Sequence, residues 1–138
     1  MAVHLDLTSF ANAVDRLTEG KTAFESDRNN PLYRDAMIQR FEFTYEMSHK
    51  MLKRFLEMTS ASPQAVDAMA FQDLIRTGSE QGLLKSGWPD WKAFRTARAS
   101  TSHGYDEAKA NEVASIVPAF LEESRFLLGE LQKRISAP

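Results

Sequence analysis

The sequence contains no cysteine among its 138 residues. This absence excludes disulfide bonds, thiolate zinc sites and a cysteine nucleophile, and it suits a reducing compartment, so we expect a cytoplasmic protein. Long apolar runs are also missing, and the residues after Met1 lack the basic start and apolar core of a secretory leader. We therefore expect a soluble, unprocessed chain that does not act in a membrane.

Charge of one sign is not in excess either. The chain carries 17 basic and 19 acidic residues, a net charge of −2 at pH 7, which argues against broad electrostatic binding of nucleic acid but leaves local recognition open. The sequence has no complete Gly-x4-Gly-Lys-Ser/Thr phosphate loop, no His-Glu-x-x-His motif and no serine nucleophile elbow. His49 has no second histidine at ligand spacing. We therefore assign no metal and no cofactor, and consider chemistry that needs neither.

Helical periodicity is what the sequence does have. It predicts helices over about residues 8–25 and 33–58, a third helical region from Pro63, a fourth that opens at residues 86–90, and a long last helix that Asp106 can cap. The helix over 33–58 is the expected spine. Pro118 should kink the last helix without ending it, because the apolar pattern resumes beyond it. No strand-like alternation is comparably strong. The sequence predicts one all-α domain over residues 1–138, an up-and-down bundle of four core helices with an additional short helix.

Residues 98–105 are where the helical pattern fails and where chemically useful side chains gather. Apolar residues upstream place Arg98 in the last turns of a helix, whereas the hydroxyl-bearing stretch and the glycine that follow favour a break. A turn could bring Arg98 and His103 together, although they would point about 140° apart on a continuous helix. Arginine suits phosphate and histidine exchanges protons near neutrality, so the pair suits phosphodiester chemistry. The structural alternative is that His103 caps a helix end and Arg98 pairs with a surface carboxylate.

A wider pattern surrounds this segment. His103 and Tyr105 follow Arg98 in the spacing Arg-x4-His-x-Tyr, and the acidic pair Asp106-Glu107 comes next. A second motif covers residues 34–43. These motifs resemble HEPN domains of the kind called nucleotidyltransferase substrate-binding proteins, and the resemblance covers most of the chain. Further residues fit the same family: Glu46, Lys50, Lys53, Ser62-Pro63, Gly82-Leu83-Leu84 and Trp91.

The resemblance implies a HEPN-like fold and a toxin–antitoxin-like pair, in which this chain is the partner and substrate of a minimal nucleotidyltransferase encoded nearby. In such families the toxin is an RNase that needs no metal. Arg98 would hold the scissile phosphate and His103 would act as base or acid. Since one arginine and one histidine make a sparse site, we expect a homodimer that joins two such segments at one cleft. AMP attached to Tyr105 would place an anion beside Arg98 and occlude that cleft. Ser102 and Asp106 are further candidate binding residues.

Two other interpretations stay open. The first is a non-catalytic module that binds a nucleotide or presents a substrate to the nucleotidyltransferase, with Arg98 and His103 as ligand contacts. Ala99 favours it, because many active members of the family have Asn or Asp directly after the arginine. The nucleotidyltransferase site itself is not in this chain, since no Asp-x-Asp follows Gly78-Ser79. The second, a structural helical adaptor, predicts that Arg98→Ala and His103→Ala change only stability.

Overall fold

The computed structural model describes residues 4–101 and 106–136, and these residues form six α-helices and no strand. The all-α prediction is therefore confirmed for the described part of the chain. In chain order the helices are α1 (Thr8–Ser26), α2 (Pro31–Thr59), α3 (Pro63–Asp67), α4 (Phe71–Glu80), α5 (Trp88–Ser100) and α6 (Glu107–Ser136). Within the same residues, no helix is long and apolar enough to cross a bilayer.

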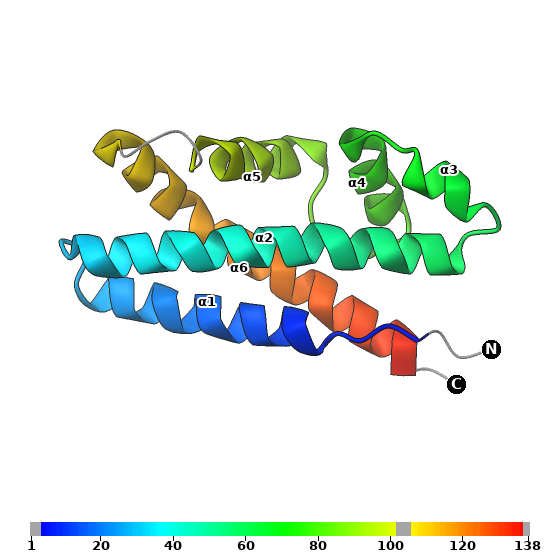
Figure 1. The fold of residues 1–138 in the computed structure, drawn as a ribbon, viewed down its shortest axis with the longest axis horizontal. Helices are drawn as coiled ribbons and strands as arrows, with labels where there is room; N and C mark the ends of the chain where they lie inside the picture. The colour runs from blue at the N-terminus through cyan, green and yellow to red at the C-terminus, as the bar shows by residue number, and fades with distance from the viewer. Residues whose placement is uncertain (1–3, 102–105, 137–138) are drawn as a thin grey trace.

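α2 is the central element. It contacts each of the other five helices, and Figure 1 shows it along the length of the molecule, with α1 on one side and α3, α4 and α5 on the other. α6 crosses α2 and also contacts α1 and α5. The expectation that this helix is the spine is confirmed.

α2 begins two residues earlier than its apolar pattern predicted, at Pro31 instead of Tyr33. The Asn30 side-chain oxygen accepts hydrogen bonds from the backbone N–H groups of Leu32 at 2.9 Å and Tyr33 at 3.3 Å. Pro31 fits the first turn because a helix leaves that N–H without a partner in any case. The cap, and not the apolar stripe, therefore sets the boundary.

The third predicted helical region is two helices, so the described chain has six helices where the sequence indicated about five. Ala70, between α3 and α4, is extended with ψ of 153°, and Phe71 then packs edge-on against His49 of α2 with ring centroids 4.8 Å apart. No proline or glycine marks this break, which explains why the pattern did not reveal it. Burial lowers the pKa of His49, so its ring packs there in the neutral form at pH 7.

The core is built around an aromatic cluster drawn from α2, α5 and α6. Phe41 and Phe120 meet edge to face at 5.1 Å, and Trp91 and Phe94 do so at 5.4 Å. Phe41, Trp91 and Phe120 are completely buried, and edge-to-face pairs of this kind add to the hydrophobic gain from burial. The cluster fixes α5 against α2 and α6, and so fixes the end of α5 where Arg98 lies.

Candidate functional site

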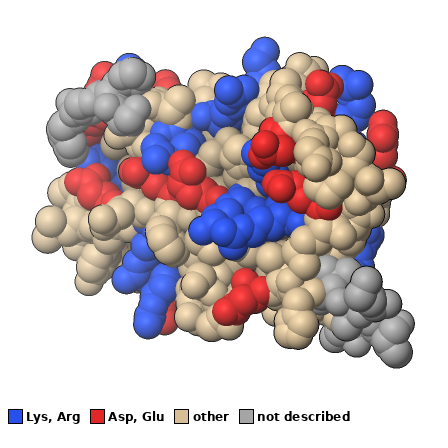
Figure 2. All heavy atoms as spheres, turned by 45° about the vertical axis from the view of Figure 1, so that its right-hand side comes forward, with Lys and Arg blue, Asp and Glu red and all other residues tan. Residues whose placement is uncertain are grey.

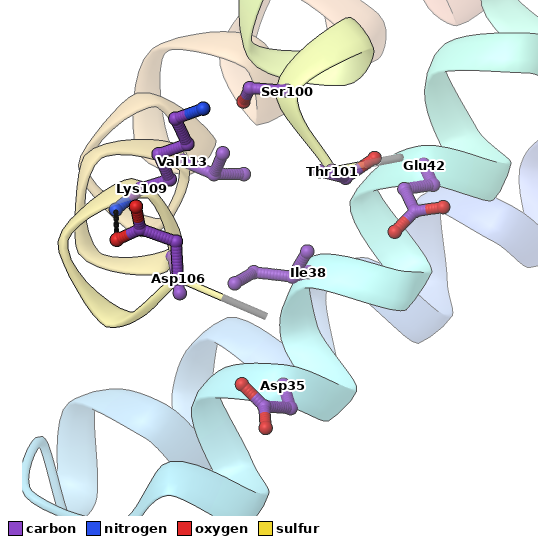
Figure 3. Close-up of a pocket in the computed structure, with 9 residues that line it drawn as sticks. Asp35, Ile38, Glu42, Ser100, Thr101, Asp106, Lys109 and Val113 are labelled. Carbon is purple, nitrogen blue, oxygen red and sulfur yellow. Dashed lines mark hydrogen bonds between the residues drawn. The ribbon is translucent and has the colours of Figure 1, made fainter. Parts of the chain in front are cut away.

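A cleft of about 200 Å³ opens where three helices meet. Figure 3 shows Asp35, Ile38 and Glu42 of α2 along one side, with Asp106, Lys109 and Val113 at the start of α6 opposite them. Ser100 and Thr101 close the upper end, at the C-terminus of α5. The cleft thus lies at the place where the sequence predicted an interruption between helices, and that interruption is confirmed.

The start of α6 is fixed by two sets of contacts. Asp106 Oδ1 accepts hydrogen bonds from the backbone N–H groups of Ala108 at 2.9 Å and Lys109 at 3.2 Å, which confirms the predicted cap. Arg34 of α2, only 5% exposed, donates from Nη1 to Glu107 Oε1 at 3.1 Å and to Asn111 Oδ1 at 3.3 Å. Because Arg34 joins α2 to α6 in this way, it fixes the two sides of the cleft relative to one another.

Arg98 lies beside this cleft and contacts residues that line it. Its Nε donates to Glu46 Oε1 at 3.0 Å and its Nη1 to Thr101 Oγ1 at 3.2 Å, while Nη1 lies 3.8 Å from Glu42 Oε2. Glu42 and Thr101 both line the cleft. The side chain of Arg98 is 28% exposed and that of Glu46 is 57% exposed, so Arg98 makes the pair with a surface carboxylate that the structural alternative predicted. Such a pair leaves other N–H groups of the guanidinium for a ligand.

Three of the predicted site residues, Ser102, His103 and Tyr105, lie outside the described residues. The convergence of His103 with Arg98 therefore stays a prediction. Asp106 does line the cleft, but its Oδ1 is engaged as the cap of α6. Of the predicted set, Asp106 lines the cleft, and Arg98 contacts two residues that line it, Glu42 and Thr101.

The charges around the cleft are mixed. Asp35, Glu42 and Asp106 contribute carboxylates and Lys109 an ammonium group, with Arg98 beside them. Figure 2 shows basic and acidic atoms interspersed over one face of the molecule. Among residues 4–101 and 106–136, no group of three or more His, Asp or Glu side chains is arranged to hold a metal ion. Such a surface suits recognition of one phosphate by one arginine, and not attraction of a long polyanion.

Sequence reasoning missed Glu123, which holds the arginine-bearing helix in place. This α6 side chain is 1% exposed, and its Oε2 accepts hydrogen bonds from Trp91 Nε1 at 3.2 Å and from the backbone N–H groups of Lys85 at 3.0 Å and Ser86 at 3.3 Å. The available signal was its position: Glu123 falls on the apolar stripe of α6, three residues after Phe120 and four before Leu127.

A family model described as "Nucleotidyltransferase substrate binding protein like" matches residues 5–133. A protein of Haemophilus influenzae named "Probable ribonuclease HepT" is 41% identical over 97 residues, a match that covers 70% of this chain and 66% of the relative. The chain thus spans about two thirds of the length of that curated relative.

Two solved structures share the fold. A Haemophilus influenzae protein, whose structure is described as revealing the fold of a substrate binding domain of a nucleotidyltransferase, has a TM-score of 0.84 at 34% identity. That likeness covers 92% of this chain and 99% of the other. A protein of Thermus thermophilus has a TM-score of 0.72 at 28% identity, covering 89% and 98% of the two chains.

Proposed function

Because the chain belongs to the nucleotidyltransferase substrate binding protein-like family, we propose that it is the partner subunit of a minimal nucleotidyltransferase and a HEPN-type RNase that cleaves RNA without a metal. The position of Arg98 carries this proposal. The side chain is held by Glu46 and by Thr101, a residue that lines the cleft, and it precedes His103 by five positions in the sequence. The relative named as a probable ribonuclease supports the activity.

The reaction is an attack within the RNA strand. His103 removes the proton of a ribose 2′-hydroxyl, and the oxygen attacks the adjacent phosphorus while the bond to the 5′-oxygen breaks. The products are a 2′,3′-cyclic phosphate and a 5′-hydroxyl, whose proton comes from a general acid. Arg98 donates hydrogen bonds to the non-bridging oxygens, where negative charge develops. The carboxylates that line the cleft would accept hydrogen bonds from ribose or base, and the phosphate would lie beside Arg98.

A second copy of the chain would supply the acid. A groove of about 630 Å³ runs between α5 and α6, and its lining, which is mostly apolar and small, includes Ala93, Thr96 and Ile116. It shares Ser100, Lys109 and Val113 with the cleft. A two-fold dimer through this groove would therefore place two Arg98–His103 segments close together. We expect Ala93→Glu to give monomers by light scattering and to abolish cleavage, whereas Ala65→Glu, on exposed α3, leaves the dimer intact. A wild-type monomer that cleaves RNA would contradict this arrangement.

Cleavage of RNA is the first test of the function. We expect protein purified without a partner to cut RNA, and Arg98→Ala and His103→Ala to lose at least about a hundredfold in rate, as removal of groups with these roles does. Arg16→Ala is the matched control, because Arg16 is an exposed arginine of α1 that pairs only locally with Glu19. Equal circular dichroism spectra establish folding. Cleavage that survives both site variants would refute the assignment.

Tyr105 is the proposed switch between an active toxin and a silent one. Transfer of AMP from ATP to its hydroxyl would release pyrophosphate and add a bulky anion next to Arg98. Co-expression with the nucleotidyltransferase should raise the intact mass by adenylyl groups and stop cleavage. Tyr105→Phe should prevent both effects, whereas Tyr33→Phe, at an exposed tyrosine of α2, should prevent neither. A mass increase that persists in Tyr105→Phe would place the modification elsewhere.

The second candidate function is a nucleotide-binding or substrate-presenting module without catalysis. Ala99 favours it, because the polar neighbour found in many active relatives is missing, and the Haemophilus influenzae structure that shares the fold at 34% identity is described as a substrate binding domain. Calorimetric titration with AMP and ATP separates the two functions. Binding that depends on Arg98, in protein shown by intact mass to be unmodified and unable to cut RNA, would favour the module.

A further inference from the structure

The α2 helix presents two carboxylates to the guanidinium of Arg98. Glu42 and Glu46 are four residues apart and so lie on one face of α2. Glu46 Oε1 accepts the Nε–H of Arg98 at 3.0 Å, whereas Glu42 Oε2 lies 3.8 Å from Nη1 and makes the looser contact. Of the two, Glu46 therefore has the stronger hold on the side chain.

Thr101 holds the guanidinium at a second point. Its Oγ1 accepts from Arg98 Nη1 at 3.2 Å and donates to the Arg98 backbone carbonyl at 2.7 Å. Nε and Nη1 are thereby engaged, and among the described residues Nη2 has no hydrogen-bond partner. The guanidinium is thus fixed at two of its three nitrogens, and the third keeps its donors for another acceptor.

Folding stability does not explain this arrangement well. Glu46 is more than half exposed, and exposed ion pairs contribute little to stability because solvent screens them and two long side chains lose rotamer freedom. An arginine that stabilises the negative charge of a transition state is more effective when its position is already fixed, because no reorganisation is then needed. Placement on a long, packed helix such as α2 makes that fixing accurate.

We infer that Glu46 is a positioning residue, which holds Arg98 through its Nε–H so that Nη2 faces a phosphate group at the rim of the cleft. The inference rests on the proposed function for its RNA substrate. Glu46 also carries a negative charge near the bound phosphate, and this charge opposes binding of the ground state. Its removal should therefore lower kcat without raising KM: catalysis becomes slower because Arg98 is less ordered, while RNA binds no more weakly.

Kinetics of three variants test this inference. Glu46→Ala should lower kcat about tenfold, as expected when a catalytic group is loosened and not removed, with KM unchanged or reduced. Glu46→Gln should recover most of kcat, because the amide oxygen can still accept the Nε–H. Glu57→Ala is the matched control, since Glu57 lies on the same helix and makes no ion pair among the described residues. An unchanged kcat in Glu46→Ala, or a loss of equal size in Glu57→Ala, would overturn the inference.

A double-mutant cycle and NMR separate this inference from the proposed function. If Glu46 acts through Arg98, adding Glu46→Ala to Arg98→Ala should lower kcat no further, and an additive loss would overturn the inference. The Arg98 Nε–H resonance should be protected from exchange in the wild type and in Glu57→Ala but not in Glu46→Ala. If the wild type cuts no RNA, the proposed function fails, and exchange of the Arg98 Nε–H is then the test of the positioning role. Protection that requires Glu46 supports that role, and protection independent of Glu46 excludes it.

Discussion

Glu123 provides the sharpest test of how this fold holds its site. Its Oε2 accepts three hydrogen bonds, from the indole of Trp91 and from the backbone N–H groups of Lys85 and Ser86. The side chain is 1% exposed. One buried carboxylate of α6 thus holds both the connection between α4 and α5 and the first turn of α5.

The cost of removing this carboxylate can be estimated from its partners. Glu123→Ala leaves three N–H groups without their acceptor, and each unpaired buried group costs about 1–3 kcal/mol. Water that enters the space would satisfy part of this need, so we expect a loss of about 3–5 kcal/mol in the free energy of unfolding. Glu123→Gln keeps one acceptor oxygen but loses its charge, and should cost about 1–2 kcal/mol. Since small domains are stable by only about 5–15 kcal/mol, the alanine variant should be close to unfolding.

Urea unfolding followed by tryptophan fluorescence and circular dichroism measures these losses. Glu122→Ala is the matched control, because the neighbouring carboxylate is 68% exposed and pairs only with the Lys85 ammonium at 3.3 Å. It should change stability by no more than about 0.5 kcal/mol. A loss of less than about 1 kcal/mol in Glu123→Ala at an unchanged m-value would refute the reasoning, because unpaired buried donors should cost more than that.

Three further predictions concern stability. Gly78→Ala should lower the free energy of unfolding by about 1–3 kcal/mol, because its new Cβ would lie 3.1 Å from two leucine side chains. Gly129→Ala, with open space around it, should raise the free energy of unfolding by up to about 1 kcal/mol in the same urea assay, because alanine favours a helix more than glycine does. Asn30→Ala should lower the thermal midpoint through a loss of about 1 kcal/mol, since it removes the cap of α2; an unchanged midpoint would contradict that role. Burial raises the pKa of Tyr45 from 10.0 to about 12, so the unfolded state loses this proton first and stability should fall as pH rises from 10 to 12. Tyr45→Phe should lack that part of the decline, and equal pH profiles would exclude it.

Much of the fold followed from local patterns. The apolar stripe predicted α2 as the spine, the serine- and glycine-containing stretch predicted that the helix of Arg98 would end, and Asp106 was recognised as a cap from its position. These features depend on neighbours a few residues apart, and such neighbours are visible in one sequence. The break between α3 and α4 was not visible, because alanines there are compatible with a continuous helix and tertiary packing of Phe71 decides the outcome.

The sequence could suggest candidate site residues but not the contacts that they make. The choice of Arg98 came from its chemistry and its place at a helix end. Its partner Glu46 is 52 positions away in the chain, and Glu123 is 32 positions from Trp91. Pairings of this kind depend on how helices cross, which no periodicity within one helix reveals.

The central position of α2 also constrains when the cleft can form during synthesis. α2 leaves the ribosome before α6, and α6 supplies the buried side chains Phe120, Leu121, Leu127 and Leu131 and one side of the cleft. Until α6 has emerged, the apolar face of α2 is not covered by α6, and the cleft lacks the side that α6 forms. A nascent or truncated chain that lacks α6 therefore cannot form this cleft, so the proposed site is complete only after α6 has been translated.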